Sequence, residues 1–274
     1  MTARELLASG TEELSRAGVP SPRVDAEWLL AHALGVSRTD LYADGNEAPA
    51  DRERVFRELV ARRASREPLA YVLGEWGFRR LALRVDPRVL IPRPETEVLV
   101  ERCLELIAEL AEPAVIDIGV GSGAIALAIA DEHPGARVVA TDSSSGALAV
   151  AAENAAQTGL AVELVAGELF GGLDGPFDLV VSNPPYVAPE EVSELPPEVA
   201  EHEPRAALIE SGATEAIARE ALSRLVPGGS LAFEVADGKA RGVADLLRGL
   251  GYEQVTIGED LAGRERVVDG RAPR

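Results

Sequence analysis

Two short segments of the chain carry residue types that could do chemistry together. Residues 117–123 read Asp-Ile-Gly-Val-Gly-Ser-Gly, and residues 183–186 read Asn-Pro-Pro-Tyr. Glycines allow tight turns and let a ligand approach the N-terminus of a helix closely. The tetrad supplies a side-chain amide, a backbone carbonyl in a stiff proline pair, and a flat aromatic ring. These types favour a site that holds a nucleotide-like cofactor beside a planar group.

The glycine-rich loop is predicted to lie between a strand and a helix, with Asp142 at the end of the following strand. An acidic side chain there can accept hydrogen bonds from both hydroxyls of a ribose. The spacing Gly119-x-Gly121-x-x-Ala124 also fits the dinucleotide fingerprint, so an NAD enzyme is an alternative. Asp117 favours another ligand, because its carboxylate would repel a pyrophosphate but could bind an ammonium group, directly or through water. We therefore expect S-adenosylmethionine as the cofactor and S-adenosylhomocysteine as its product.

The Asn-Pro-Pro-Tyr tetrad suits the handling of a planar –NH2 group. It follows a predicted strand at residues 177–182, at the sheet edge where ligands bind. An amide nitrogen is a poor nucleophile because its lone pair is delocalised into the carbonyl. The Asn183 side-chain carbonyl could accept one N–H and the Pro184 backbone carbonyl the other, while Tyr186 offers a flat face. Holding both hydrogens would aim the nitrogen at a methyl donor, which predicts a methyltransferase for a planar amide or amine.

The elements that position these segments alternate between strands and helices. A helix is expected to begin at Pro94, with Glu95 and Glu97 in its first turn, and to continue through Leu110. The alternation predicts an α/β fold with parallel strands and ligands at their carboxyl ends. The expected strands are 114–118, 136–141, 162–165, 177–182 and 230–235 with a closing pair at 252–257 and 265–268, and the expected helices are 123–132, 146–158, 214–225 and 238–250.

The first third of the chain has a different pattern. Apolar residues at helical spacing predict helices at 4–17, 23–34 and 51–64. Short apolar runs between turn residues predict strands at 71–74, 76–78, 81–85 and 89–91. We therefore expect a helical N-terminal domain at residues 1–70, a β-hairpin linker at 71–92 and the catalytic domain at 93–274. The helical domain has no catalytic constellation, so we assign it the docking of a protein substrate.

The charge of the chain is unevenly placed. Residues 1–92 contain 14 arginines and 14 acidic residues, so residues 93–274 carry the whole net charge of −19. Such an acidic module would repel a phosphate backbone unless it kept a basic groove, and none is apparent in that half. The charge therefore argues against direct binding of nucleic acid.

Other residue counts limit the class of protein further. There is one cysteine, Cys103, and the three histidines, His32, His133 and His202, are scattered without metal-ligand spacing. We expect neither an intrachain disulfide nor a metal site. No apolar run is long enough to cross a bilayer, and the N-terminus lacks the pattern of a signal peptide. We expect a cytoplasmic monomer without a membrane partner.

The chain resembles the peptide chain release factor N5-glutamine methyltransferases, the PrmC/HemK family, over nearly its full length. The most specific signature is residues 90–97, which read Leu-Ile-Pro-Arg-Pro-Glu-Thr-Glu, and further similar segments are 66–74, 183–186, 203–208, Glu234 and 260–268. The resemblance implies a Rossmann-like class I S-adenosylmethionine methyltransferase sheet with a small N-terminal helical domain and a β-hairpin linker. It also implies methylation of the side-chain amide nitrogen, N5, of the glutamine in the Gly-Gly-Gln motif of release factors.

The resemblance assigns roles to individual positions. The glutamine would be held by Asn183, Pro184, Pro185 and Tyr186. The segment Arg93, Pro94, Glu95 and Thr96 would shape the cofactor pocket near the methionine end. The residues expected to bind the cofactor are Asp117, Gly119, Val120, Gly121, Ser122, Gly123, Asp142, Glu168, Leu169 and Asn183.

Three alternatives stay open at this point. A glutamine methyltransferase of a ribosomal protein would share the same chemistry. An adenine or cytosine N-methyltransferase of nucleic acid would use the same tetrad on an exocyclic amine, although the acidic catalytic half disfavours it. A non-catalytic binding protein on a methyltransferase scaffold is the third, since a fold does not establish a function.

Overall fold

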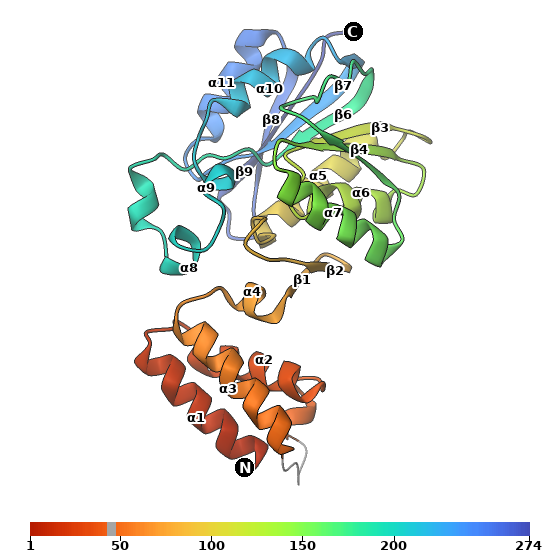
Figure 1. Cartoon of the computed structure of the whole chain (residues 1–274). Coiled ribbons are helices and arrows are strands. Elements are labelled where there is room, and N and C mark those ends of the chain that lie inside the picture. Colours follow the sequence, from red (N-terminus) through yellow and green to blue (C-terminus); the bar gives the residue numbers. More distant parts are fainter. Residues whose placement is uncertain (43–47) are drawn as a thin grey trace. The chain divides into compact units, whose positions relative to one another are not determined.

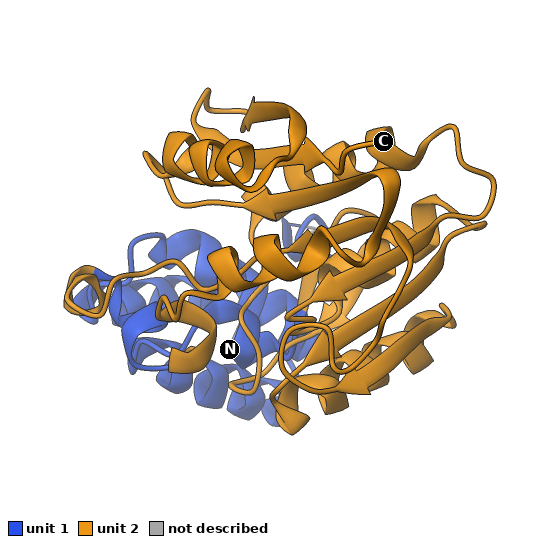
Figure 2. Cartoon of the chain, turned by 90° about the horizontal axis from the view of Figure 1, so that it is seen from above, with its two compact units in different colours: residues 1–75, 195–202 blue, residues 76–194, 203–274 orange. Residues whose placement is uncertain are grey.

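The computed structural model describes residues 1–42 and 48–274, which form two compact units. The first unit comprises Met1–Glu75 and Leu195–His202, and the second comprises Trp76–Glu194 and Glu203–Arg274. Figure 2 shows the two units in different colours. The segment Leu195–His202 therefore packs with the N-terminal helices, although the sequence analysis placed it in the catalytic domain. No helix in the described part of the chain combines the length and apolar character needed to span a membrane.

The first unit is built from helices, as the apolar periodicity predicted. A capping box begins the first of them, because Thr2 accepts from the Glu5 backbone N–H and the Glu5 side chain accepts from the Thr2 N–H. The helices pack closely, and a Cβ added at Gly10 would lie 2.6 Å from Cζ of Phe56. The elements are α1 (Ala3–Arg16), α2 (Pro22–Leu34), η1 (Asp40–Tyr42), α3 (Ala50–Ala64), α4 (Leu69–Leu73) and α8 (Pro197–Ala200).

A buried ion cluster ties the segment Leu195–His202 to α3 within this unit. Arg63 is 4% exposed and donates to Oδ2 of Asp25 at 2.8 Å and to Oε1 of Glu198 at 2.8 Å. Arg66 donates to both oxygens of Glu198, at 2.8 and 2.7 Å. Burial alone would raise the pKa of Glu198, but hydrogen bonds from Arg66 and Arg63 lower it to about 2. Glu198 is therefore a carboxylate at neutral pH, held by two guanidinium groups.

The predicted strand at residues 71–74 is wrong, because this stretch belongs to the helix α4. Pro68 precedes the helix, and Gly74 ends it in the left-handed conformation with φ 78°. Consecutive apolar residues are compatible with a short buried helix as well as with a buried strand, and burial of Ala70, Tyr71 and Val72 favours the helix here. The predicted strand at 89–91 is also absent, and the hairpin consists of β1 (Glu75–Phe78) and β2 (Leu81–Arg84) alone.

The second unit contains a seven-stranded sheet in the order β5-β4-β3-β6-β7-β9-β8. Strands β5 to β7 are parallel, whereas β9 runs antiparallel to both β7 and β8. The chain moves outward from β3 through β4 to β5 and then crosses to β6, which places a switch point at the carboxyl ends of β3 and β6. The strands are β3 (Ala114–Ile118), β4 (Arg137–Asp142), β5 (Val162–Ala166), β6 (Phe177–Ser182), β7 (Leu225–Glu234), β8 (Glu253–Glu259) and β9 (Glu265–Arg271).

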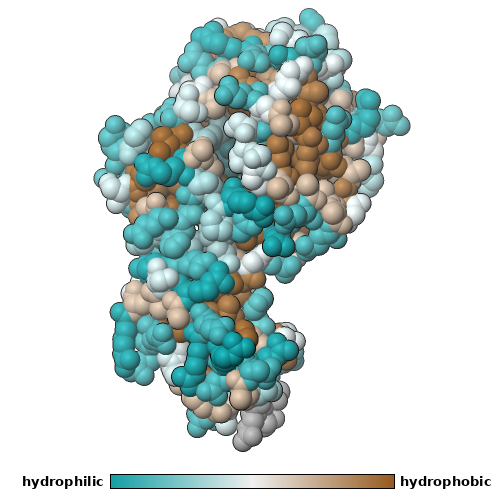
Figure 3. Space-filling model, in the orientation of Figure 1, coloured by the Kyte–Doolittle hydropathy of each residue, from teal (hydrophilic) through white to brown (hydrophobic). Residues whose placement is uncertain are grey.

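Helices cover both faces of this sheet, as Figure 1 shows. One apolar core packs α5 (Pro94–Ile107), α6 (Ala124–Glu132) and α7 (Ser145–Thr158) against one face. A second core packs α10 (Ala213–Ala221) and α11 (Ala240–Leu250) against the other. The three-layer arrangement confirms the predicted α/β class with a mostly parallel sheet. In Figure 3 the surface of this unit carries hydrophobic patches between hydrophilic areas.

The long connection after β6 contains short helices that the sequence analysis did not predict. These are η2 (Glu191–Glu194), α8 and α9 (Arg205–Leu208). An isolated parallel bridge joins Val187 to Ile209 and fixes the start and the end of the connection to each other. The stretch between them is rich in proline and acidic residues and has no long apolar period, so propensity alone does not show its short helices.

Candidate functional site

A cavity of about 570 Å³ lies at the carboxyl ends of β3, β4 and β6 in the second unit. This is the switch point of the sheet, where open α/β folds bind their ligands. Its volume is within the range of small-molecule sites. The glycine-rich loop after β3, the end of β4 and the tetrad after β6 all contribute to its wall. The fold thus brings the glycine-rich loop and the Asn-Pro-Pro-Tyr tetrad to one cavity.

The glycine-rich loop is held by the strand beside it. The backbone N–H groups of Gly119 and Val120 both donate to the carbonyl of Thr141, at 2.9 Å. Gly119 and Gly121 have φ angles of 83° and 52°, which favour glycine. A Cβ added at either position would meet no protein atom within 4 Å, so the loop leaves open space on its cavity side. A ligand can therefore approach the backbone there without a steric barrier.

Asp142 closes the loop from the end of β4. Its Oδ2 accepts from the Gly121 N–H at 3.0 Å, and its Oδ1 accepts from the Ser144 N–H at 2.8 Å. An ionised carboxylate has about four lone-pair positions, so these two hydrogen bonds orient the group and leave acceptor capacity for a ligand. The side chain lines the cavity, where the sequence analysis expected a ribose acceptor.

Asp117 is placed differently from the expectation that it binds a ligand. Its side chain is 0% exposed, does not line the cavity, and accepts from the Ala126 N–H through Oδ2 at 3.2 Å. Burial raises the pKa of Asp117 to about 8, helped by the negative charge of Asp142 and opposed by the hydrogen bond from Ala126. The structure therefore gives Asp117 a supporting contact with α6 behind the loop.

The tetrad begins directly after β6, and Asn183 faces the cavity. Its side-chain Nδ2 donates to Oγ1 of Thr96 at 3.4 Å, and the Thr96 hydroxyl donates to Oε2 of Glu234 at 2.6 Å. Ser182 fixes the end of the strand by donating to the carbonyl of Ile118 at 2.7 Å. Three elements, β6, α5 and β7, thus meet at the Asn183 amide.

Charged and phenolic groups surround this meeting point. Arg93 donates to both oxygens of Glu203, at 2.6 and 2.7 Å, and burial raises the pKa of Glu203 despite that arginine. Burial raises the pKa of Tyr186 to about 12, and the nearby Glu234 carboxylate acts in the same direction. The Tyr186 phenol therefore stays protonated at neutral pH and is not a base there.

The cavity collects most of the residues that the sequence analysis singled out, but not all of them. Those that do not line it are Pro94, Glu95, Asp117, Gly123 and Tyr186. Those that line it are Arg93, Thr96, Gly119, Val120, Gly121, Ser122, Asp142, Glu168, Leu169, Asn183, Pro184 and Pro185.

Asn154 is a supporting residue that the sequence analysis missed. It is 0% exposed on α7, and its Nδ2 donates to the carbonyls of Ser122 and Arg84 at 2.8 and 3.0 Å. Its Oδ1 accepts from the Arg84 N–H at 2.7 Å, so one amide joins the glycine-rich loop to β2. The sequence did contain a signal for this buried role, because Asn154 lies four positions after Val150 and so shares the apolar face of an alanine-rich helix.

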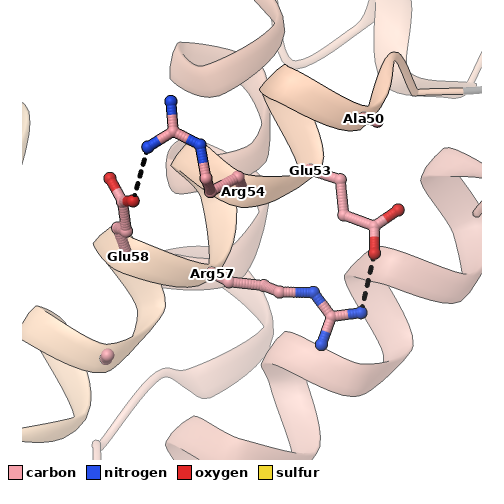
Figure 4. Close-up of a pocket in the computed structure, with 6 residues that line it drawn as sticks. Ala50, Glu53, Arg54, Arg57 and Glu58 are labelled. Atoms are coloured by element: carbon pink, nitrogen blue, oxygen red, sulfur yellow. Dashed lines mark hydrogen bonds and ion pairs between the residues drawn. The ribbon is translucent and has the colours of Figure 1, made fainter.

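A second hollow, on the surface of α3, has no comparable chemistry. Its charged side chains are already paired, since Arg54 donates to Glu58 and Arg57 donates to Glu53, both at 2.8 Å (Figure 4). Both pairs are spaced four residues apart on one exposed helix face, which is a common surface arrangement. The cavity in the second unit is therefore the candidate site.

Two family models match different parts of the chain. Residues 5–74 match the family model "PrmC N-terminal domain", and residues 95–255 match "Methyltransferase small domain". Among solved structures, a ribosomal protein L11 methylase from Lactobacillus delbrueckii subsp. bulgaricus is 24% identical and has a TM-score of 0.53, covering 70% of this chain and 86% of that one. A 16S rRNA methyltransferase from T. thermophilus, in complex with AdoMet and guanosine, is 17% identical with a TM-score of 0.54, covering 72% of this chain and 49% of that one. These two likenesses show the methyltransferase fold.

Curated relatives match nearly the whole chain. A release factor glutamine methyltransferase of Deinococcus radiodurans is 45% identical and covers 99% of both chains. The one of Geobacter sulfurreducens is 43% identical, covering 98% of this chain and 96% of the relative. The one of Mycolicibacterium smegmatis is 42% identical, covering 97% and 96%. The chain belongs to the release factor glutamine methyltransferase family.

Proposed function

We propose that this protein transfers a methyl group from S-adenosylmethionine to the side-chain amide nitrogen of the Gly-Gly-Gln glutamine in peptide chain release factors. The observation that carries the proposal is the position of Asn183 and Pro184 in the wall of the cavity that the glycine-rich loop also lines. The names of the relatives support the choice of acceptor, because they are release factor glutamine methyltransferases.

The cavity suits S-adenosylmethionine by its volume of about 570 Å³ and by the polar groups that line it. Gly119 and Gly121 leave open space for the ligand, and we assign Asp142 to the ribose hydroxyls because its carboxylate keeps free acceptor positions. Glu168 and Leu169 line the same cavity and are assigned to the adenine end, while Arg93 and Thr96 line its other part. When bound, this cofactor supplies an electrophilic methyl group on a sulfonium.

The tetrad residues prepare the acceptor nitrogen. We assign the Asn183 Oδ1 and the Pro184 carbonyl to accept the two N–H bonds of the glutamine –NH2 group. As the nitrogen attacks the methyl group, positive charge develops on it, and two fixed acceptors stabilise that charge. The same two contacts restrict the nitrogen to one orientation, which lowers the entropic part of the barrier. Pro185 stiffens the turn, and we assign the Tyr186 ring to pack against the planar amide.

The reaction releases one proton from the methylated nitrogen. A base is not required before attack, because the amide lone pair reacts without prior deprotonation. Tyr186 is protonated at neutral pH, with its pKa raised to about 12 by burial, so it does not remove this proton. The N-protonated amide product is strongly acidic, and water can accept its proton.

The decisive experiment offers the purified protein and isotopically labelled S-adenosylmethionine to three acceptors: an unmethylated release factor, ribosomal proteins and DNA. We expect one added methyl group on the Gly-Gly-Gln glutamine of the release factor, located by mass spectrometry of the isolated peptide. Label on a ribosomal protein or on DNA, with the release factor unmodified, would overturn the proposed acceptor. Failure to bind the cofactor by calorimetry would overturn the enzymatic function altogether.

We also propose that the helical unit docks the protein substrate and that the protein acts as a monomer in the cytoplasm, where release factors work. Five large apolar or aromatic side chains among the described residues of this unit are more than a third exposed: Met1 (46%), Val24 (43%), Trp28 (42%), Val36 (39%) and Tyr42 (61%). Val24 and Trp28 are four residues apart on α2 and so share one face. Exposed apolar side chains of this kind mark contact surfaces when they cluster.

Replacement of Trp28 by alanine tests the docking role. We expect KM for an intact release factor to rise about 10-fold, the effect of one aromatic contact worth more than about 1 kcal/mol. For a short Gly-Gly-Gln peptide, which lacks the rest of the release factor, kcat/KM is expected to stay unchanged. Equal losses for both acceptors would contradict the docking role.

A further inference from the structure

The Asn183 carboxamide can serve the proposed reaction only in one of its two orientations. Its oxygen must face the acceptor, because the glutamine –NH2 group offers hydrogens and no acceptor. Rotation by 180° about the last side-chain bond would present Nδ2 instead, and two –NH2 groups would then oppose each other. A group in the protein must therefore select the productive orientation.

Two buried side chains stand behind this amide. Thr96 on α5 is 4% exposed and Glu234 at the end of β7 is 2% exposed. The Thr96 hydroxyl donates to Oε2 of Glu234 at 2.6 Å, and Nδ2 of Asn183 donates to Oγ1 of Thr96 at 3.4 Å. No donor among residues 1–42 and 48–274 binds Oδ1 of Asn183.

We propose that Thr96 and Glu234 are positioning residues that turn the Asn183 carbonyl toward the acceptor. The inference rests on the proposed function and follows from the number of hydrogens that each of the three side chains can donate. A carboxylate can only accept, so Glu234 takes the single hydroxyl hydrogen of Thr96. Oγ1 of Thr96 is then left with acceptor capacity only, and Nδ2 of Asn183 must face it. The carbonyl oxygen of Asn183 points the other way, and the chain of carboxylate, hydroxyl and amide fixes its direction.

This selection depends on the charge of Glu234. Burial raises the pKa of Glu234 to about 7, and Glu95 on α5 acts in the same direction. Hydrogen bonds from Thr96 and Asn183 and the charge of Arg266 on β9 oppose that rise, and the neutral Tyr186 phenol also lies near. When Glu234 is protonated it can donate to Thr96, and the Thr96 hydroxyl hydrogen then points to Asn183 and favours the unproductive orientation, in which Oδ1 of Asn183 accepts from Thr96. The productive orientation is therefore selected above about pH 7 and lost below it.

Kinetics with an intact release factor and the full-length protein test this inference. The wild-type kcat is expected to fall about 10-fold per pH unit below about pH 7, as the fraction of ionised Glu234 falls. In Glu234→Gln, which has no proton to gain, this dependence should disappear. Thr96→Val should lower kcat about 100-fold at pH 8, the scale of a misplaced contact, while Thr96→Ser retains the hydroxyl and recovers most of the rate. The Kd for S-adenosylmethionine should change less than about twofold in Glu234→Gln, because Glu234 does not line the cavity.

Thr256 provides a matched control in the same unit. Its hydroxyl donates to Asp269, a carboxylate that is 2% exposed, and neither residue lines the cavity. Thr256→Val also removes a hydroxyl that donates to a buried carboxylate, although Thr256 itself is exposed, so it reports the general effect of losing such a hydrogen bond from the sheet. We expect this variant to keep the wild-type kcat and pH profile. Equal losses in Thr96→Val and Thr256→Val would assign both effects to stability and overturn the positioning role.

The Asn183 side-chain NH2 resonance in an NMR spectrum gives a readout that does not depend on the acceptor. It should shift with a midpoint near pH 7 in the wild-type protein and stay constant in Glu234→Gln. A resonance that does not titrate in the wild type would overturn the inference. A resonance that titrates as expected in a protein that leaves release factors unmodified would instead reject the proposed acceptor and keep the role of Glu234.

Discussion

Substitution of Asn183 by alanine is expected to lower kcat for methyl transfer to a release factor by at least about 100-fold, the cost of removing one fixed polar contact to a developing charge. The side chain lines the cavity and makes its protein hydrogen bond through Nδ2 alone, which leaves Oδ1 for the acceptor. Alanine removes that acceptor and leaves the backbone of the tetrad in place. Single-turnover rates with labelled cofactor measure the change directly.

Asp142→Ala is the matched control for Asn183→Ala. Asp142 lines the cavity from the end of β4 and is assigned to the ribose, so its loss should weaken cofactor binding more than the chemical step. Two hydrogen bonds to a charged group contribute about 3–6 kcal/mol, which corresponds to a rise of at least roughly 100-fold in Kd. A wild-type rate in Asn183→Ala at saturating cofactor would refute the clamp.

Substitution of Arg63 by methionine is expected to destabilise the helical unit by about 3–5 kcal/mol, because it leaves the buried Asp25 carboxylate without its arginine. Arg63 bonds to Asp25, which is 7% exposed, and to Glu198, and it also donates to the carbonyl of Glu67 at 3.2 Å. Hydrogen exchange of the α1, α2 and α3 amides measures the loss locally, which matters because a chain with two units need not unfold in one step.

Arg54→Met on the same helix is the control for Arg63→Met. Arg54 pairs with Glu58, but the two side chains are 69% and 60% exposed, and such pairs contribute less than about 0.5 kcal/mol (Figure 4). The contribution of Glu198 should also depend on pH. Its pKa is lowered to about 2, so the stabilisation is complete above its ordinary pKa of 4.5 and is lost as the pH falls from there toward 2. Protection in Arg63→Met equal to that in Arg54→Met would contradict the importance of the cluster.

Regular elements with a clear period were predicted well from the sequence. The strand at residues 114–118 has the predicted bounds, and most other strands and helices of the second unit begin and end within a few residues of the prediction. The predicted closing pair was also confirmed as β8 and β9, and the structure shows that these two strands are antiparallel. These elements follow from local pattern, since buried parallel strands are continuously apolar and covering helices repeat every 3.6 residues.

Short apolar runs were predicted less well. Residues 71–73 are helical and residues 89–91 are not in a strand, because a run of three or four apolar residues fits more than one backbone conformation. The connection after β6 was also misread as part of one catalytic domain. Its charged residue Glu198 pairs with arginines more than 130 positions away along the chain, and no local pattern reveals such a partner.

The sequence by itself determined the family, the order of strands and helices, and the two chemical segments, because each of these depends on residues that are close together along the chain. Only the tertiary structure decided which of those residues face the cavity. It placed Asp117 behind the glycine-rich loop, brought Asn154 to the carbonyl of Ser122, and set Thr96 and Glu234 behind the Asn183 amide. The physical reason is that hydrogen-bond direction and burial are set by neighbours across the sheet, and Thr96 and Glu234 are 138 residues apart.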